Sequence, residues 1–237
     1  MRSHLYAIIS VPLFGFLYLH TAIGVLIILI LAIFHLKAPI RFLTQYWAKS
    51  VFLILGKKFT ITGKENIDRK KRYILLANHG SLFDIVAIMS FYSGLSWFGH
   101  ERLLKIPVFG KFLRMTDYIP FQEPTYKNTK RMIQQLTHNS DYKTVAIFPE
   151  GTRTLNGRIN HFYRGFIYLF RTRELEILPV TLNGFYNLKP KNRSYINFDS
   201  KLEVIIHKPI QREALLDKKD CEIIETIRNI IESAYNW

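Results

Sequence analysis

Two short segments of the chain carry residues that could do chemistry together. The first, which begins at Asn78, places an imidazole (His79) and a carboxylate (Asp84) five positions apart. The second places the carboxylate of Glu150, a glycine and the guanidinium of Arg153 in one short loop. An imidazole paired with a carboxylate can take a proton from a hydroxyl, and a guanidinium can bind an anion. The two segments therefore predict a base that activates a hydroxyl beside a pocket for an anionic substrate.

Both segments lie where a strand is expected to end. Residues 72–77 read as a short buried strand, and an apolar helical run follows Ser81, which can cap that helix with Asp84 three positions on. Residues 144–148 read as a second buried strand, stopped by Pro149. The second loop could also be a plain turn with an exposed ion pair, worth under about 1 kcal/mol. Open α/β sheets bind ligands beyond the carboxyl ends of their strands, so we expect the two loops to share one active site.

These segments resemble sequence blocks of the glycerolipid acyltransferases, the PlsC-like superfamily that includes the lysophosphatidic acid acyltransferases. Residues 78–84 (NHGSLFD) match the NHxSxxD block, and residues 148–153 (FPEGTR) match the third block. Two softer matches, KIPVFG at residues 105–110 and LPVTLNG at residues 178–184, complete four blocks in the family's order. The resemblance covers roughly residues 60–210.

The resemblance implies transfer of a fatty acyl group from acyl-CoA or acyl carrier protein to the free hydroxyl of a lysophospholipid, with no cofactor. The expected acceptor is 1-acylglycerol-3-phosphate, which would give phosphatidic acid. His79 would act as general base, oriented by Asp84, in a triad arrangement whose nucleophile is the substrate hydroxyl. Residues of the matched blocks are expected to contact the substrate, namely Asn78, Ser81, Lys105, Glu150, Gly151, Thr152 and Arg153.

No other catalytic pattern competes with this one in the sequence. There is no G-x-S-x-G elbow, no phosphate-binding glycine loop and no cluster of residues with metal-ligand spacing. The single cysteine, Cys221, lies in a helical run and is expected to be a packing residue, and one cysteine excludes an internal disulfide.

One departure from the family pattern concerns the acceptor. Relatives commonly carry an arginine after the second block that is attributed to binding the glycerol phosphate, and Glu123 occupies that position here. Lys127, Lys130 or Arg131 could substitute for it. Alternatively, the same chemistry acts on a different lysolipid.

The N-terminal third predicts contact with a membrane. Residues 5–36 contain no formally charged side chain, which allows either one long helix over about residues 13–36 or a helical hairpin broken near His20 and Thr21. Residues 40–55 follow as an amphipathic helix in which Arg41, Gln45 and Lys49 form a polar stripe. The alternative is an ordinary helix that covers the sheet.

The net charge of +15 favours anionic partners. It suits anionic lipids, phosphorylated substrates and an acidic carrier protein, and the uncharged N-terminus favours a membrane protein over a nucleic-acid-binding one. A non-catalytic basic protein that binds membrane or nucleic acid is the alternative from another class. The basic residues between Lys37 and Lys58 place the catalytic domain on the cytoplasmic face.

The rest of the pattern predicts an α/β fold with a mixed open sheet flanked by helices. Residues 1–56 are expected to form membrane-engaging helices, and residues 57–237 an acyltransferase domain. Strands are expected at residues 59–63, 73–77, 95–99, 118–121, 145–148, 177–182 and 202–207. Helices are expected at residues 82–92, 107–115, 126–137, 164–173 and 212–235, with an exposed loop at residues 187–192.

Overall fold

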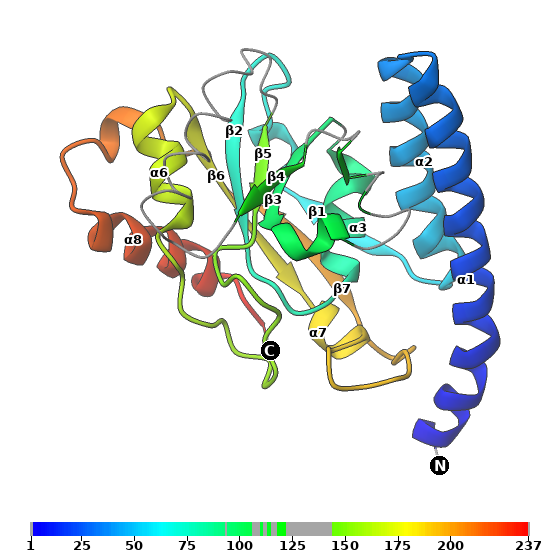
Figure 1. Cartoon of the computed structure of the whole chain (residues 1–237). Coiled ribbons are helices and arrows are strands. Elements are labelled where there is room, and N and C mark those ends of the chain that lie inside the picture. The colour runs from blue at the N-terminus through cyan, green and yellow to red at the C-terminus, as the bar shows by residue number, and fades with distance from the viewer. Residues whose placement is uncertain are drawn as a thin grey trace.

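A seven-stranded sheet forms the centre of the molecule (Figure 1). The computed structural model describes residues 2–92, 94–105, 110, 113–114, 118–121 and 144–236. The strands are β1 (Phe59–Thr62), β2 (Tyr73–Ala77), β3 (Ser96–His100), β4 (Ile119–Phe121), β5 (Val145–Ile147), β6 (Glu176–Asn183) and β7 (Leu202–Ile206). The predicted mixed open sheet is confirmed, and each predicted strand is found with its ends shifted by at most one residue.

The strand order is β1-β7-β6-β2-β5-β3-β4, and every neighbouring pair is parallel except β6 with β7. β2 lies at the centre of this order and is buried along its whole length. Its side chains alternate between two hydrophobic cores, with Tyr73 and Leu75 in one and Ile74 and Leu76 in the other. A strand that is buried on both faces reads as a continuous apolar run, which is why this one was predictable.

Helices cover both faces of the sheet (Figure 1). The core on one face includes residues of α1 (Arg2–Ile33), α2 (Lys37–Ile54) and α3 (Phe83–Phe91). The core on the other face includes residues of α6 (Gly165–Thr172) and α8 (Asp220–Ser233). The short helix α7 (Phe185–Leu188) and the 3-10 turns η1 (Lys64–Asn66), η2 (Glu101–Lys105) and η3 (Arg212–Ala214) complete the described elements.

The predicted C-terminal helix over residues 212–235 is interrupted. Only η3 and α8 form within it, because the polar residues Asp217 to Lys219 offer no apolar side chain for the sheet to bury. α8 then begins with the Lys219 N–H donating to the Glu222 carboxylate. The predicted helix at residues 126–137 and most of that at residues 107–115 lie outside the described residues, as do Glu123, Lys127, Lys130 and Arg131.

The N-terminal segment is one continuous helix, so of the two predicted alternatives the single long helix is confirmed and the hairpin broken near His20 and Thr21 is wrong. The helix begins earlier than predicted, at Arg2. His20 needs no break because its Nε2 lies 2.8 Å from the Ser50 hydroxyl of α2. The chain reverses instead between α1 and α2, where His35 has a left-handed backbone with φ of 55°. α1 and α2 then pack side by side as an antiparallel pair (Figure 1).

Of the predicted polar stripe of α2, only Gln45 is turned toward the domain, whereas Arg41 and Lys49 are exposed. Gln45 donates a hydrogen bond to the Ser90 carbonyl of α3, while Phe42, Tyr46 and Leu53 are 72%, 61% and 79% exposed. The same helix also buries Val51, Phe52 and Leu55 in the core that it shares with the sheet. The exposed apolar side chains of Phe42, Tyr46 and Leu53, next to exposed bases, are suited to the boundary between hydrocarbon and lipid headgroups.

Candidate active site

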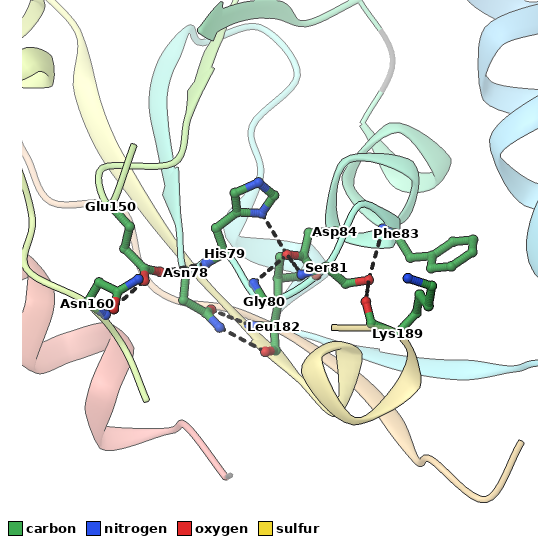
Figure 2. A network of polar contacts seen from close by, with 10 residues as sticks. All are labelled: Asn78, His79, Gly80, Ser81, Phe83, Asp84, Glu150, Asn160, Leu182 and Lys189. Atoms are coloured by element: carbon green, nitrogen blue, oxygen red, sulfur yellow. Dashed lines mark hydrogen bonds and ion pairs between the residues drawn. The ribbon is translucent and has the colours of Figure 1, made fainter. Parts of the chain in front are cut away.

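The loop between β2 and α3 brings His79 and Asp84 together (Figure 2). His79 Nδ1 lies 2.8 Å from Asp84 Oδ2, and the two side chains are 12% and 0% exposed. Because a carboxylate only accepts, the imidazole N–H of this contact belongs to Nδ1. Nε2 is then the ring nitrogen that can accept a proton from a substrate.

The Asp84 carboxylate also organises the backbone of the loop. Its Oδ2 accepts hydrogen bonds from the N–H groups of Gly80 and Ser81, each at 2.7 Å. The predicted helix cap between Ser81 and Asp84 is therefore half formed. Asp84 accepts the N–H of Ser81, but the Ser81 hydroxyl accepts the N–H of Phe83 and not that of Asp84. The helix itself begins later, at Phe83, whose N–H lies 3.3 Å from Ser81 Oγ. The carboxylate that orients the imidazole thus also fixes the turn that carries it.

Asn78 and Ser81, both predicted to contact the substrate, are buried and bonded to backbone groups (Figure 2). Asn78 exchanges two hydrogen bonds with the backbone of Leu182 in β6, at 3.0 and 2.8 Å. The Ser81 hydroxyl donates to the Lys189 carbonyl at 2.7 Å. Since neither residue lines the cavity beside His79, we interpret both as supports of the catalytic loop.

Glu150 joins the second loop to the first. Its Oε1 accepts the N–H of His79 at 2.6 Å, and its Oε2 accepts the N–H of Asn160 at 2.8 Å. The Thr154 N–H donates back to the His79 carbonyl at 2.9 Å. These contacts bring the two predicted loops side by side, as Figure 2 shows for Glu150 and His79. Gly151 makes the turn after Glu150 with a φ of +67°, a left-handed conformation that favours glycine.

Burial raises the pKa of the Glu150 carboxyl to about 7, against the hydrogen bonds from Asn160 and His79, which lower it. The folded protein therefore holds this proton more tightly than the unfolded chain between about pH 4.5 and 7. We expect the free energy of unfolding to fall by about 3 kcal/mol as the pH rises through this range. Chemical unfolding in detergent measures this dependence, with Glu150→Gln as the non-titrating control. An identical slope in the variant would contradict the assignment.

Aromatic rings hold the imidazole from the side. The His79 ring stacks on Phe148, with centroids 3.9 Å apart and an angle of 13° between the planes. Phe148 stacks in turn on Trp97 of β3 at 5.7 Å. Phe148 belongs to the FPEGTR segment, but nothing in its spacing pointed to a contact with His79. The stack restricts the ring to the orientation in which Nδ1 faces Asp84.

A cavity of about 980 Å³ opens beside His79. Glu150, Gly151, Thr152 and Arg153 line it together with His79, as expected for substrate-contacting residues. Most of the remaining wall is apolar and comes from α2, α3, β3 and α6, including Trp47, Leu82, Ile85, Met89, Leu95, Phe98 and Phe166. Lys105 is exposed at the end of η2 and does not line the cavity. The cavity therefore combines polar groups at His79 with a lining that is mostly apolar elsewhere.

Within the described part of the chain, the lining of the cavity also contains four bases, Arg41, Arg153, Arg164 and Lys191. Arg153 and Lys191 both line it, and neither has an ion-pair partner among the described residues. Burial, followed by the nearby charges of Arg153 and Arg193, lowers the pKa of the Lys189 ammonium. These lysines lie in the segment predicted as an exposed loop, and that prediction is partly wrong because Leu188 and Pro190 are buried. Three bases at alternate positions 189, 191 and 193 were the sequence signal for this cluster.

Comparisons with known proteins agree with this architecture. The family model described as Acyltransferase matches residues 58–183. The chain is 27% identical to the chloroplastic 1-acyl-sn-glycerol-3-phosphate acyltransferase of Arabidopsis thaliana, over 72% of this chain and 48% of that protein. It is 30% identical to the 1-acyl-sn-glycerol-3-phosphate acyltransferase of Borreliella burgdorferi, over 65% of this chain and 61% of that protein. The chain thus spans about half to three-fifths of the length of these curated relatives.

The fold resembles a solved structure as well. The crystal structure of the 1-acyl-sn-glycerophosphate acyltransferase PlsC from Thermotoga maritima superposes with a TM-score of 0.81 at 22% identity, over 95% of this chain and 94% of that one. The matched family model covers more than half of the chain, and its span includes both loops of the candidate site. The chain belongs to the acyltransferase family.

Proposed function

We propose that this protein transfers a fatty acyl group from an acyl thioester to the free hydroxyl of a lysophospholipid, with 1-acylglycerol-3-phosphate as the preferred acceptor and phosphatidic acid as the product. The observation that carries this proposal is the His79–Asp84 pair beside a mostly apolar cavity of about 980 Å³ that Arg153 and Lys191 also line. The names of the relatives support the same reaction. Acyl-CoA and acyl carrier protein are both suitable donors, and the transfer needs no cofactor.

The chemistry follows from the position of His79. Its Nε2 takes the proton of the acceptor hydroxyl as that oxygen attacks the thioester carbonyl. Asp84 stabilises the imidazolium that forms, and the proton then passes to the departing thiolate, which leaves as a free thiol. The products are the new ester and the free thiol, so no acyl-enzyme is needed.

The oxyanion of the tetrahedral intermediate needs N–H donors. The N–H groups of Gly80 and Ser81 are engaged by Asp84, and that of Gly151 by the Phe148 carbonyl. Thr152 and Arg153 are adjacent residues that line the cavity beside His79, and their N–H groups have no hydrogen-bond partner among the described residues. We assign the oxyanion contact to this pair.

The acceptor phosphate is assigned to Arg153, with Lys191 beside it. We expect Arg153→Gln to raise KM for the phosphate-bearing acceptor by about 10- to 100-fold, since a charge-assisted hydrogen bond contributes about 1.5–3 kcal/mol. kcat is expected to change less. Initial rates over a range of acceptor concentrations measure the split, with Arg158→Gln, an exposed arginine of the same loop, as control. Equal losses in both variants would remove Arg153 from the phosphate site.

The α1–α2 pair is proposed to hold the protein in the membrane. α1 is long and apolar enough to cross a bilayer, and only 11% of its most apolar window is buried. The same helix is tied to the domain through Ser10, whose hydroxyl accepts the Ile196 N–H, and to α2 through His20 and Ser50. A helix docked in this way places the cavity beside the hydrocarbon, where both lipid substrates reside. The bases that follow α1 favour the cytoplasmic face for the domain.

Acyl transfer by the purified protein in lipid nanodiscs tests the proposal. Acyl-CoA and acyl carrier protein serve as donors, and the acceptors are lysophosphatidic acid and lysolipids whose phosphate carries a second ester. Turnover on lysophosphatidic acid is the expected result. Turnover confined to another lysolipid would favour the second candidate acceptor and make Glu123 a specificity residue. No transfer to any acceptor by folded protein would overturn the proposal.

A further inference from the structure

A second cavity of about 550 Å³ lies beside α2, away from His79. Its walls come from the C-terminal half of α2, from β1, from the segment around η1 and from the end of α3. None of the residues assigned to acyl transfer lines it. We call this second cavity the basic cleft.

The charges that line the basic cleft all have one sign. Its lining contains five bases, Lys49, Lys57, Lys58, Lys64 and Arg69, and no acidic residue among those described. Lys57 is already engaged, because its ammonium donates to the Phe198 and Ser200 carbonyls. The other four have no ion-pair partner among the described residues. The basic cleft therefore presents uncompensated positive charge to a ligand.

The floor of the basic cleft is apolar. Phe52, Leu53, Phe59, Ile61, Ile67 and Phe91 contribute to its lining. A free phosphate or a nucleic-acid backbone would leave this surface uncovered. An amphiphile with an anionic head and an apolar tail would match both parts of the cleft.

The basic cleft borders the surface proposed to meet the bilayer. Leu53 lines the cleft and also belongs to the exposed apolar face of α2 with Phe42 and Tyr46. A lipid can therefore reach the cleft sideways from the membrane, without crossing water. Gln45 lines both cavities, and its hydrogen bond to the Ser90 carbonyl lies between them. An occupant of the cleft would contact the same α2–α3 packing that walls the catalytic cavity.

We propose that the basic cleft binds one anionic phospholipid of the surrounding bilayer, with its phosphate among Lys49, Lys58, Lys64 and Arg69 and an acyl chain on the apolar floor. The bound lipid fixes α2 against the domain at the membrane surface. The site is independent of acyl transfer, because no group assigned to the reaction takes part in it.

Lipid retention by the full-length protein tests this site directly. His79→Ala protein is placed in nanodiscs that contain phosphatidylcholine and phosphatidylglycerol, released into mild detergent and examined by native mass spectrometry without any acyl donor. One phosphatidylglycerol per chain is expected to remain bound. Adding Lys58→Gln and Lys64→Gln is expected to weaken retention about 30-fold, since each base near a lipid surface contributes about 1 kcal/mol.

The matched control carries Lys208→Gln and Lys218→Gln, which remove the same charge from exposed positions outside the cleft. This control is expected to retain the lipid as the parent does, and circular dichroism checks that both double variants are folded. A lipid held in the catalytic cavity would be retained equally by both double variants, which would overturn the proposal. Equal retention of phosphatidylcholine, or binding of acyl carrier protein in place of lipid, would overturn it as well.

Discussion

Turnover is expected to fall by about 10²- to 10⁴-fold when Asp84 is replaced by asparagine, while the protein stays folded. One oxygen of Asp84 accepts from His79 Nδ1 and from the N–H groups of Gly80 and Ser81. An asparagine oxygen can still accept the backbone N–H groups, so the loop is preserved. It carries no negative charge, so the imidazolium formed in the reaction loses its stabilising partner. Steady-state acyl transfer in nanodiscs measures the loss.

Asp84→Ala separates the charge of Asp84 from its role in the loop. Alanine leaves two buried N–H groups unpaired, which we expect to lower the free energy of unfolding by about 1–3 kcal/mol for each group. Asp84→Asn is expected to be inactive but stable, and Asp84→Ala inactive and destabilised. An asparagine variant with turnover within about ten-fold of wild type would show that His79 works without this carboxylate.

The second large effect is expected at Glu150. Glu150→Ala removes the acceptor for the N–H groups of His79 and Asn160, both of which point at its carboxylate. The backbone of His79 is then free to shift, and a displacement of about 1 Å in a catalytic group can lower the rate about 10²-fold. The free energy of unfolding is also expected to fall, by about 1–3 kcal/mol for each unpaired group. Turnover and thermal unfolding of the same preparation measure both effects.

Glu150→Gln provides the matched comparison, because its amide has one oxygen and can satisfy only one of the two N–H groups. We expect an intermediate turnover and an intermediate stability. If both variants were inactive yet as stable as wild type, Glu150 would act on the substrate rather than on the position of His79. The family resemblance predicted only that Glu150 contacts the substrate, so this comparison decides between the two roles.

The strands were predictable because each buried strand is a short run of apolar residues that can be recognised from its own sequence. β2 and β5 are short apolar runs between polar residues, and such runs can be read without knowing their neighbours. The order of the strands was not predictable in this way. Nothing in the periodicity of β1 shows that it pairs with β7, whose residues lie about 140 positions later in the chain.

The sequence also could not predict which side of α2 packs against the rest of the protein. Its spacing predicted a polar stripe and an apolar face, and both exist. Which of the two would face the domain depends on whether the other side meets water or hydrocarbon. In the structure, Gln45 contacts Ser90 of α3, whereas Arg41 and Lys49 are exposed on the outer side together with Phe42, Tyr46 and Leu53.

The residues of the two loops were predictable from their types and spacing, whereas their supports were not. His79, Asp84, Glu150 and Arg153 stand out because each is ionisable and follows a strand. The contacts of Asn78 with Leu182 and of Phe148 with His79 join distant or unremarkable positions that local patterns do not mark. Lys191 lies in a segment whose composition predicts an exposed loop, so its sequence position does not mark it as a site residue.

Acyl transfer by the His79→Ala variant tests the role of His79 most directly. Wild type and variant are compared in the same nanodiscs with the same thioester donor and lysophosphatidic acid, after both are shown to be folded and membrane-bound. We expect the variant to lose about 10²- to 10⁴-fold in turnover with little change in membrane binding. A folded variant that transfers the acyl group at the wild-type rate would show that another group takes the hydroxyl proton.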